Sequence, residues 1–99
     1  MSMLYDEIYC MNVSCNITAN LRIYSEDHLE EAIQQDYDIK GFRIIDPEHN
    51  PDEVKEIENS TDASGIDPHN EYLILYLTSG ETATFRNSFV LMDLRFKRG

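Results

Sequence analysis

The clearest structural signal in the sequence is the stretch EYLILYLTSGETATFR, residues 71–86. An apolar run is followed by turn residues and then by a second strand pattern, which is typical of a β-hairpin. Residues directly opposite each other on antiparallel strands share a face, so the length of the loop sets which residues pair. We predict a three-residue loop with Gly80 in the left-handed conformation, because a two-residue loop would pair leucines with threonines. The pairs expected in that register are Leu73 with Phe85 and Leu75 with Ala83.

A third strand is expected at residues 89–96, after a break at Asn87 and Ser88. Alternate positions are apolar, and Asp93 and Arg95 lie between them, which is typical of a strand with one buried face. The apolar positions are Val90, Met92, Leu94 and Phe96. We predict that this strand extends the hairpin into a meander of three strands.

Residues 9–23 show the longest alternating pattern. Every odd position from Tyr9 to Ile23 is apolar or aromatic, and the even positions from Asn12 to Arg22 are polar. This pattern predicts a strand region with one core face and one polar face. The region exceeds the usual strand length of about 3–10 residues, so we expect a bend, a bulge or a three-residue loop within it. The polar face is either the solvated side of a sheet or a contact surface.

Residues 26–37 carry the pattern of an amphipathic helix. Ser25 stands where an N-cap residue is expected, and carboxylates follow in the first turn, where the helix dipole favours them. Apolar residues then recur at three- and four-residue spacing and give one apolar stripe. These residues are Leu29, Ala32, Ile33 and Tyr37. We predict that the helix packs on the sheet, that Gly41 follows its end, and that residues 42–45 form a short strand.

A second, shorter helix is predicted at residues 51–59, because Asn50 can cap it and Pro51 suits its first position. Residues 60–70 are rich in Ser, Asp, Gly and Pro and are expected to form an exposed loop. The predicted fold is therefore α+β, a single domain over residues 1–99. It has an antiparallel sheet of four to six strands with both helices packed on one face.

The charge of the chain is the strongest functional signal. Nineteen acidic residues against eight basic ones give a net charge of −11, outside the magnitude of about 2–8 that is usual for a small soluble domain. Direct binding to nucleic acid or to an anionic membrane is disfavoured by such a charge, and a basic partner is favoured. No stretch reaches the ~18 apolar residues of a membrane span, and no signal-peptide pattern begins the chain. We therefore expect a cytoplasmic protein.

Two stretches of the sequence have the residue types of a metal or catalytic site, but neither has the required arrangement. One acidic stretch begins like a calcium loop, but Pro51 and Ile57 replace the turn glycine and the closing glutamate. The acidic stretch consists of Asp46, Glu48, Asn50 and Asp52. Ser64, Asp67 and His69 have the residue types of a catalytic triad, but they crowd one loop without a rigid scaffold. We predict no enzyme activity, no cofactor and no bound metal.

The acidic residues are concentrated in the middle of the chain, where residues 26–71 contain fifteen carboxylates and three bases. If both predicted helices cover one face of the sheet, their outer sides form a continuous negative surface. On the first helix the density is about one charge per ~2 Å of axis, close to the ~1.7 Å of duplex DNA. The carboxylates predicted to bind a partner are Glu26, Asp27, Glu30, Glu31, Asp52, Glu53, Glu56 and Glu58.

In size and charge, though in no motif, the chain resembles small phage-encoded inhibitors of restriction and CRISPR enzymes, and immunity proteins of nuclease toxins. This resemblance implies a nucleic-acid mimic that occupies the basic surface of a nuclease or another nucleic-acid-binding protein. The alternative is a structural or assembly module, which associates through an apolar sheet face or as a homodimer. That alternative rests on residues 72–77, which are apolar or aromatic on both faces.

Overall fold

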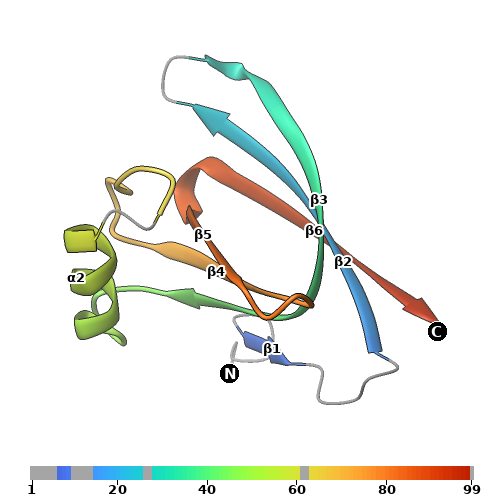
Figure 1. The fold of residues 1–99 in the computed structure, drawn as a ribbon. Coiled ribbons are helices and arrows are strands. Elements are labelled where there is room, and N and C mark those ends of the chain that lie inside the picture. Colours follow the sequence, from blue (N-terminus) through green and yellow to red (C-terminus); the bar gives the residue numbers. More distant parts are fainter. Residues whose placement is uncertain (1–6, 10–14, 26–27, 61–62, 99) are drawn as a thin grey trace.

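A computed structural model describes residues 7–9, 15–25, 28–60 and 63–98 (Figure 1). The elements are β1 Glu7–Tyr9, β2 Cys15–Ser25, β3 His28–Ile45, α2 Pro51–Ser60, β4 Tyr72–Leu77, β5 Thr82–Arg86, the 3₁₀-helix η1 Asn87–Phe89, and β6 Val90–Arg98. The described residues form a six-stranded sheet in the order β5-β4-β3-β2-β6, with β1 paired to β3. All strand pairs are antiparallel. The predicted α+β class and the predicted range of strand number are therefore confirmed.

The sheet is organised around β3, which is 18 residues long. Its first part pairs with β2 up to Ile39, and its last part pairs with β4 from Ile39 to Ile45. β1 pairs with residues 41–43, which also pair with β4, so β1 and β4 lie on opposite edges of β3. The strand thus belongs to two half-sheets, one with β2 and β6 and the other with β4, β5 and β1.

A β-bulge bends β3 between these two half-sheets. On β4 the neighbours Leu77 and Tyr76 pair with Ile39 and Gly41, so Lys40 is an extra residue on β3. A bulge of this kind bends the strand and increases its twist. The sheet consequently curves, as the path of β3 in Figure 1 shows.

The main core lies between the two half-sheets. It consists of buried apolar side chains from four strands: Ile17, Ala19, Leu21, Ile39, Phe42, Leu73, Leu75 and Phe85. Tyr37 of the first half-sheet also meets Phe85 of the second, edge to face, with ring centroids 5.7 Å apart. The two halves are therefore held together by apolar burial across the bend.

A second, smaller core forms where α2 packs on the other face of β4. Val54 of α2 is buried there with Ile45, Ala63, Tyr72 and Ile74. The apolar second face of residues 72–77, on which the assembly alternative was based, is thus covered by the helix. The predicted helix at residues 51–59 is confirmed as α2.

The predicted helix at residues 26–37 is wrong, because residues 28–45 form β3 and residues 26–27 lie outside the described part. A four-residue spacing of apolar side chains is a multiple of two, so it fits a strand as well as a helix. The strand is preferred because β2 supplies matching partners: Ile23 pairs with Ile33, and Ala19 with Tyr37. The same carboxylates would also repel one another one turn apart on a helix.

The hairpin of β4 and β5 has the predicted register. Leu73 pairs with Phe85 and Leu75 with Ala83. The N–H of Leu77 donates to the carbonyl of Glu81 at 2.9 Å, and Gly80 has φ +96°. These observations confirm the three-residue loop with a left-handed glycine.

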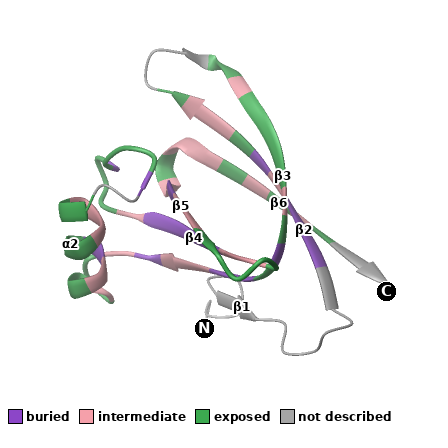
Figure 2. Cartoon of the chain, viewed as in Figure 1, coloured by how far each residue is buried: buried purple, intermediate pink, exposed green. Residues whose placement is uncertain are grey.

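The predicted meander is wrong, because η1 redirects the chain and β6 pairs with β2. The predicted faces of that strand are nevertheless correct for the side chains described. Val90, Met92 and Leu94 pack against the main core, and Asp93 and Arg95 are exposed. Exposed and half-buried bands follow one another along β6 in Figure 2.

No helix in the described part of the chain has the length and apolar character needed to cross a membrane.

Candidate partner-binding surfaces

The carboxylates predicted to bind a partner lie in two groups, not on one continuous surface. Glu30 and Glu31 are exposed near the start of β3 and point to opposite faces, because they are neighbours on a strand. The other described members lie on α2, which follows the far end of β3 (Figure 1). They are Asp52, Glu53, Glu56 and Glu58. Glu26 and Asp27 lie outside the described residues.

Within the α2 group, Glu53 is held by an ion pair. Arg43 of β3 donates from both terminal nitrogens to the two oxygens of Glu53, at 3.0 and 3.1 Å. These hydrogen bonds raise the pKa of Arg43 above its ordinary value. Asp52 and Glu56 are exposed, whereas Glu58 is half-buried. The charge that α2 presents to a partner therefore comes mainly from Asp52 and Glu56.

Two carboxylates that the sequence reasoning assigned to no site, Asp36 and Asp38, are exposed on β3. Each is paired with a polar residue of β2. The side-chain amide of Asn20 donates to Asp36 Oδ1 at 2.6 Å, and the hydroxyl of Thr18 donates to Asp38 Oδ1 at 3.4 Å. The short hydrogen bond from Asn20 favours one orientation of Asp36, whereas the contact of Thr18 with Asp38 is long for a hydrogen bond between oxygens; both carboxylates remain exposed.

Asp36 and Asp38 belong to a surface that we call the polar sheet face. It lies on the side of β6, β2 and β3 opposite the main core, and its cross-strand rows follow from the strand register. The rows are Arg95–Thr18–Asp38, Asp93–Asn20–Asp36 and Leu91–Arg22–Gln34. Asn20 thus stands between two carboxylates. The even-numbered polar positions of residues 12–22 predict the β2 part of this face. The β3 part is not predicted, because the sequence pattern of residues 26–37 favours a helix.

The β2–β3 hairpin projects beyond the rest of the sheet (Figure 1). Ile33 is on the core side there, paired with Ile23, yet it is 68% exposed because the second half-sheet does not reach it. Glu30 and Glu31 lie beside it on the same projecting segment. This end of the hairpin offers carboxylates on both faces and one exposed apolar side chain.

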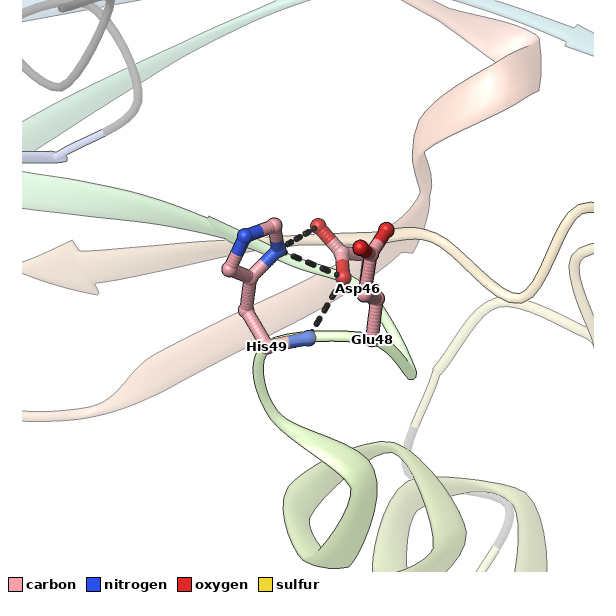
Figure 3. Close-up of side chains that lie close together, drawn as sticks. All are labelled: Asp46, Glu48 and His49. Atoms are coloured by element: carbon pink, nitrogen blue, oxygen red, sulfur yellow. Dashed lines mark hydrogen bonds and ion pairs between the residues drawn. The ribbon is translucent and has the colours of Figure 1, made fainter.

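A further cluster lies in the turn between β3 and α2, where Asp46, Glu48 and His49 bring their ligand atoms within 4.8 Å of one another (Figure 3). Asp46 accepts a hydrogen bond from the backbone N–H of His49 at 2.8 Å, and its carboxylate contacts His49 Nδ1 at 3.0 Å. The backbone hydrogen bond is the main cause of the lowered pKa of Asp46. These residues offer mixed ligands for a divalent cation, but their contacts are equally those of a self-stabilised turn.

The three residues with the composition of a catalytic triad are used differently. Asp67 is fully buried. Its carboxylate accepts hydrogen bonds from the backbone N–H of His69 at 2.7 Å, the N–H of Ser88 at 2.9 Å and the Ser88 hydroxyl at 2.6 Å. Asp67 therefore ties its loop to η1, and Ser64 and His69 are exposed on that loop.

A shallow groove separates α2 from the outer face of β4 and β5. Its lining mixes carboxylates with apolar and hydroxyl side chains: Glu53, Glu56, Ile57, Ser60, Ile74, Tyr76, Thr82 and Thr84. Of its two carboxylates, Glu53 is paired with Arg43 and Glu56 is exposed. The groove does not distinguish one class of ligand from another.

No protein-family profile, curated protein or solved structure matches the chain. The function of the chain must therefore be inferred from its own charge and geometry.

Proposed function

We propose that this protein is a non-enzymatic inhibitor, which uses its exposed carboxylates to occupy the basic, nucleic-acid-binding surface of a partner protein. The partner class suggested by the size and charge of the chain is a cytoplasmic nuclease or other nucleic-acid-binding protein of phage or host defence. The protein would then act by mimicking DNA or RNA, without binding nucleic acid itself.

The observation that carries the proposal is the pair Asp36 and Asp38 on the polar sheet face. The two carboxylates are two positions apart on a strand, which separates them by about 6.6 Å. This is close to the spacing of every second phosphate along one DNA strand, where the rise per nucleotide is about 3.4 Å. The hydrogen bond from Asn20 favours one orientation of Asp36 before any partner binds, which reduces the entropy lost on binding. Glu30 and Glu31 extend the negative charge toward the tip of the hairpin.

The net charge of −11 supports the same function at long range. A field of this sign attracts a basic surface and raises the association rate, most strongly at low salt. Exposed Asp52 and Glu56 on α2 add to the field at another part of the molecule. We assign them a secondary role, because among the described residues no side chain donates to Asp52 or Glu56 as Asn20 donates to Asp36.

The proposal is tested with a double variant, Asp36→Asn with Asp38→Asn, and a matched control, Asp52→Asn with Glu56→Gln. Both remove two charges and keep the size of the side chains. Each tagged protein is incubated at about 0.1 M salt with nuclease-containing lysate, washed at that salt and then at about 0.5 M, and the proteins released by the second wash are identified. We expect a nucleic-acid-binding protein that is released at the higher salt and displaced by added DNA or RNA.

The strand variant should lose at least about tenfold in affinity for that protein, and the helix control should lose less. Equal binding by the parent and both variants would contradict the proposal. If only the helix control lost affinity, the protein would still be an acidic inhibitor, but its binding surface would lie on α2.

The alternative function, an assembly module, is no longer favoured by an open apolar face of β4, because α2 covers that face. Self-association would have to use another part of the sheet.

A further inference from the structure

The two edges of the sheet are treated differently by the fold. β5 is an edge strand of five residues. Its outer side is partly covered, because Ala63 forms a parallel bridge with Thr84 and the N–H of Ser64 donates to the Thr84 carbonyl at 3.2 Å. Short length and a covering loop are two of the ways in which proteins prevent an edge from pairing with another chain.

Within the described part of the chain, β6 at the other edge has neither protection. It is nine residues long and pairs with β2 without any register shift. Its sequence, VLMDLRFKR, contains neither proline nor glycine. Within the described residues its second edge pairs with no strand. Leu91, on the polar sheet face of this strand, is 58% exposed. Such an edge is suited to accept another strand.

The charges on β6 indicate which strand it would accept. In an antiparallel pair of identical strands, the two-fold axis passes midway between the two copies of one residue, and the positions before and after that residue face each other. Leu94 is the middle residue of Val90–Arg98, so a register centred on Leu94 pairs the full length of both strands. That register places Asp93 opposite Arg95 of the second copy, and the symmetry repeats the pair.

Registers centred one residue away are disfavoured. A register centred on Asp93 sets two aspartates directly opposite each other, and one centred on Arg95 sets two arginines opposite each other although it also brings Asp93 opposite Lys97; like charges opposite each other destabilise a cross-strand pair. The register of greatest overlap is thus the one of these three that has opposite-charge pairs and no like-charge pair. Asp93 and Arg95 are both exposed, and within the described structure neither takes part in an ion pair.

The local composition also suits self-association of an otherwise acidic protein. β6 contains three bases and one acid, so its charge is opposite to that of the rest of the chain and lessens the repulsion between two acidic copies that meet there. We infer that β6 is the interface of a homodimer, in which two β6 strands pair antiparallel about Leu94 and join the sheets of both copies. This inference is independent of the proposed inhibitory function.

The test exchanges the two charges. Asp93→Arg alone and Arg95→Asp alone each create two like-charge contacts across the interface, whereas the double variant Asp93→Arg/Arg95→Asp restores two opposite-charge contacts. Molar mass is measured by light scattering and sedimentation over a range of protein concentrations. We expect the parent and the double variant to form dimers of twice 11.5 kDa, and each single variant to dissociate at least about tenfold more readily.

The single variants also separate the local contact from the overall charge. Asp93→Arg makes the chain two units less negative and would strengthen dimers if net repulsion alone governed association, whereas the inferred interface requires it to weaken them. A monomeric parent at high concentration would overturn the inference. The inference would also be overturned if both single variants still formed dimers, or if the double variant did not regain dimer formation. Circular dichroism of each variant checks that the fold is retained.

Discussion

At the scale of single residues, the least expected role belongs to Asp67. It is a charged residue at 0% exposure, which is costly unless its oxygens are hydrogen-bonded. Both oxygens are bonded, by donors from His69 and Ser88. The backbone N–H of Asp67 in turn donates to the hydroxyl of buried Tyr72 at 3.2 Å. One side chain thus connects the loop after α2 with the 3₁₀-helix that directs the chain into β6.

We therefore expect Asp67→Ala to destabilise the protein by about 2–3 kcal/mol, because buried N–H donors are left without an acceptor. The measurement is the free energy of unfolding in urea. Exposed Asp52→Ala is the matched control and should change that free energy by less than about 0.5 kcal/mol. If the two variants are equally stable, the Asp67 hydrogen bonds contribute nothing net.

Which carboxylates a partner can reach depends on contacts that the sequence does not reveal. The charge of Glu53 predicts a binding residue, but its side chain forms an ion pair with Arg43, ten positions earlier. Asp36 and Asp38 are not among the predicted residues, and their side chains contact Asn20 and Thr18 of another strand. Composition identifies which residues are charged. Which of them present that charge to a partner depends on contacts between elements.

At the scale of elements, local patterns predicted α2, the hairpin of β4 and β5, and the faces of β2 and β6. Each of these is specified by neighbouring residues, such as Asn50 and Pro51 at the helix start or Gly80 in the turn. The sequence predicts a helix where β3 lies, because the four-residue spacing of Ile33 and Tyr37 fits a helix as well as a strand. What decides it is the pairing with Ile23 and Ala19, and this is a tertiary contact that a local pattern does not contain.

The turn of the β4–β5 hairpin gives a prediction at this scale. Gly80 has φ +96°, and a Cβ added there would meet no atom within 4 Å, so a side chain would cost backbone strain only. We expect Gly80→Ala to lower the unfolding free energy by about 1 kcal/mol, and Ser79→Ala to have a smaller effect. Thermal or urea unfolding checks the difference. Equal stability of the two variants would mean that the loop adopts another turn without cost.

At the scale of the whole molecule, the net charge should destabilise the fold. Folding gathers the like charges of a chain with net −11 into a smaller volume. The screening length falls from ~30 Å at 0.01 M salt to ~10 Å at 0.1 M, which weakens this repulsion. We therefore expect the unfolding free energy to rise as sodium chloride is added over that range. Urea titrations at each salt concentration test this, and stability that falls with added chloride would show that attractive ion pairs dominate.

The overall topology was the least predictable property of the molecule. The class and the approximate number of strands followed from counting local patterns. The pairing of β6 with β2, and the sharing of β3 between two half-sheets, did not. Local patterns in a sequence do not specify which distant strands pair, and the expected meander joins strands that are neighbours in the chain.

The pairing of β6 with β2 also bears on the order in which the molecule folds. The β4–β5 and β2–β3 hairpins join segments that are close in the chain, so they form with little loss of chain entropy. Residues 90–98 must instead find residues 15–23, and contacts between such distant segments slow folding. Until they meet, β2 has an unpaired edge next to the exposed apolar residues of an unfinished core. The closing step of folding is therefore also the period when the chain is most open to aggregation.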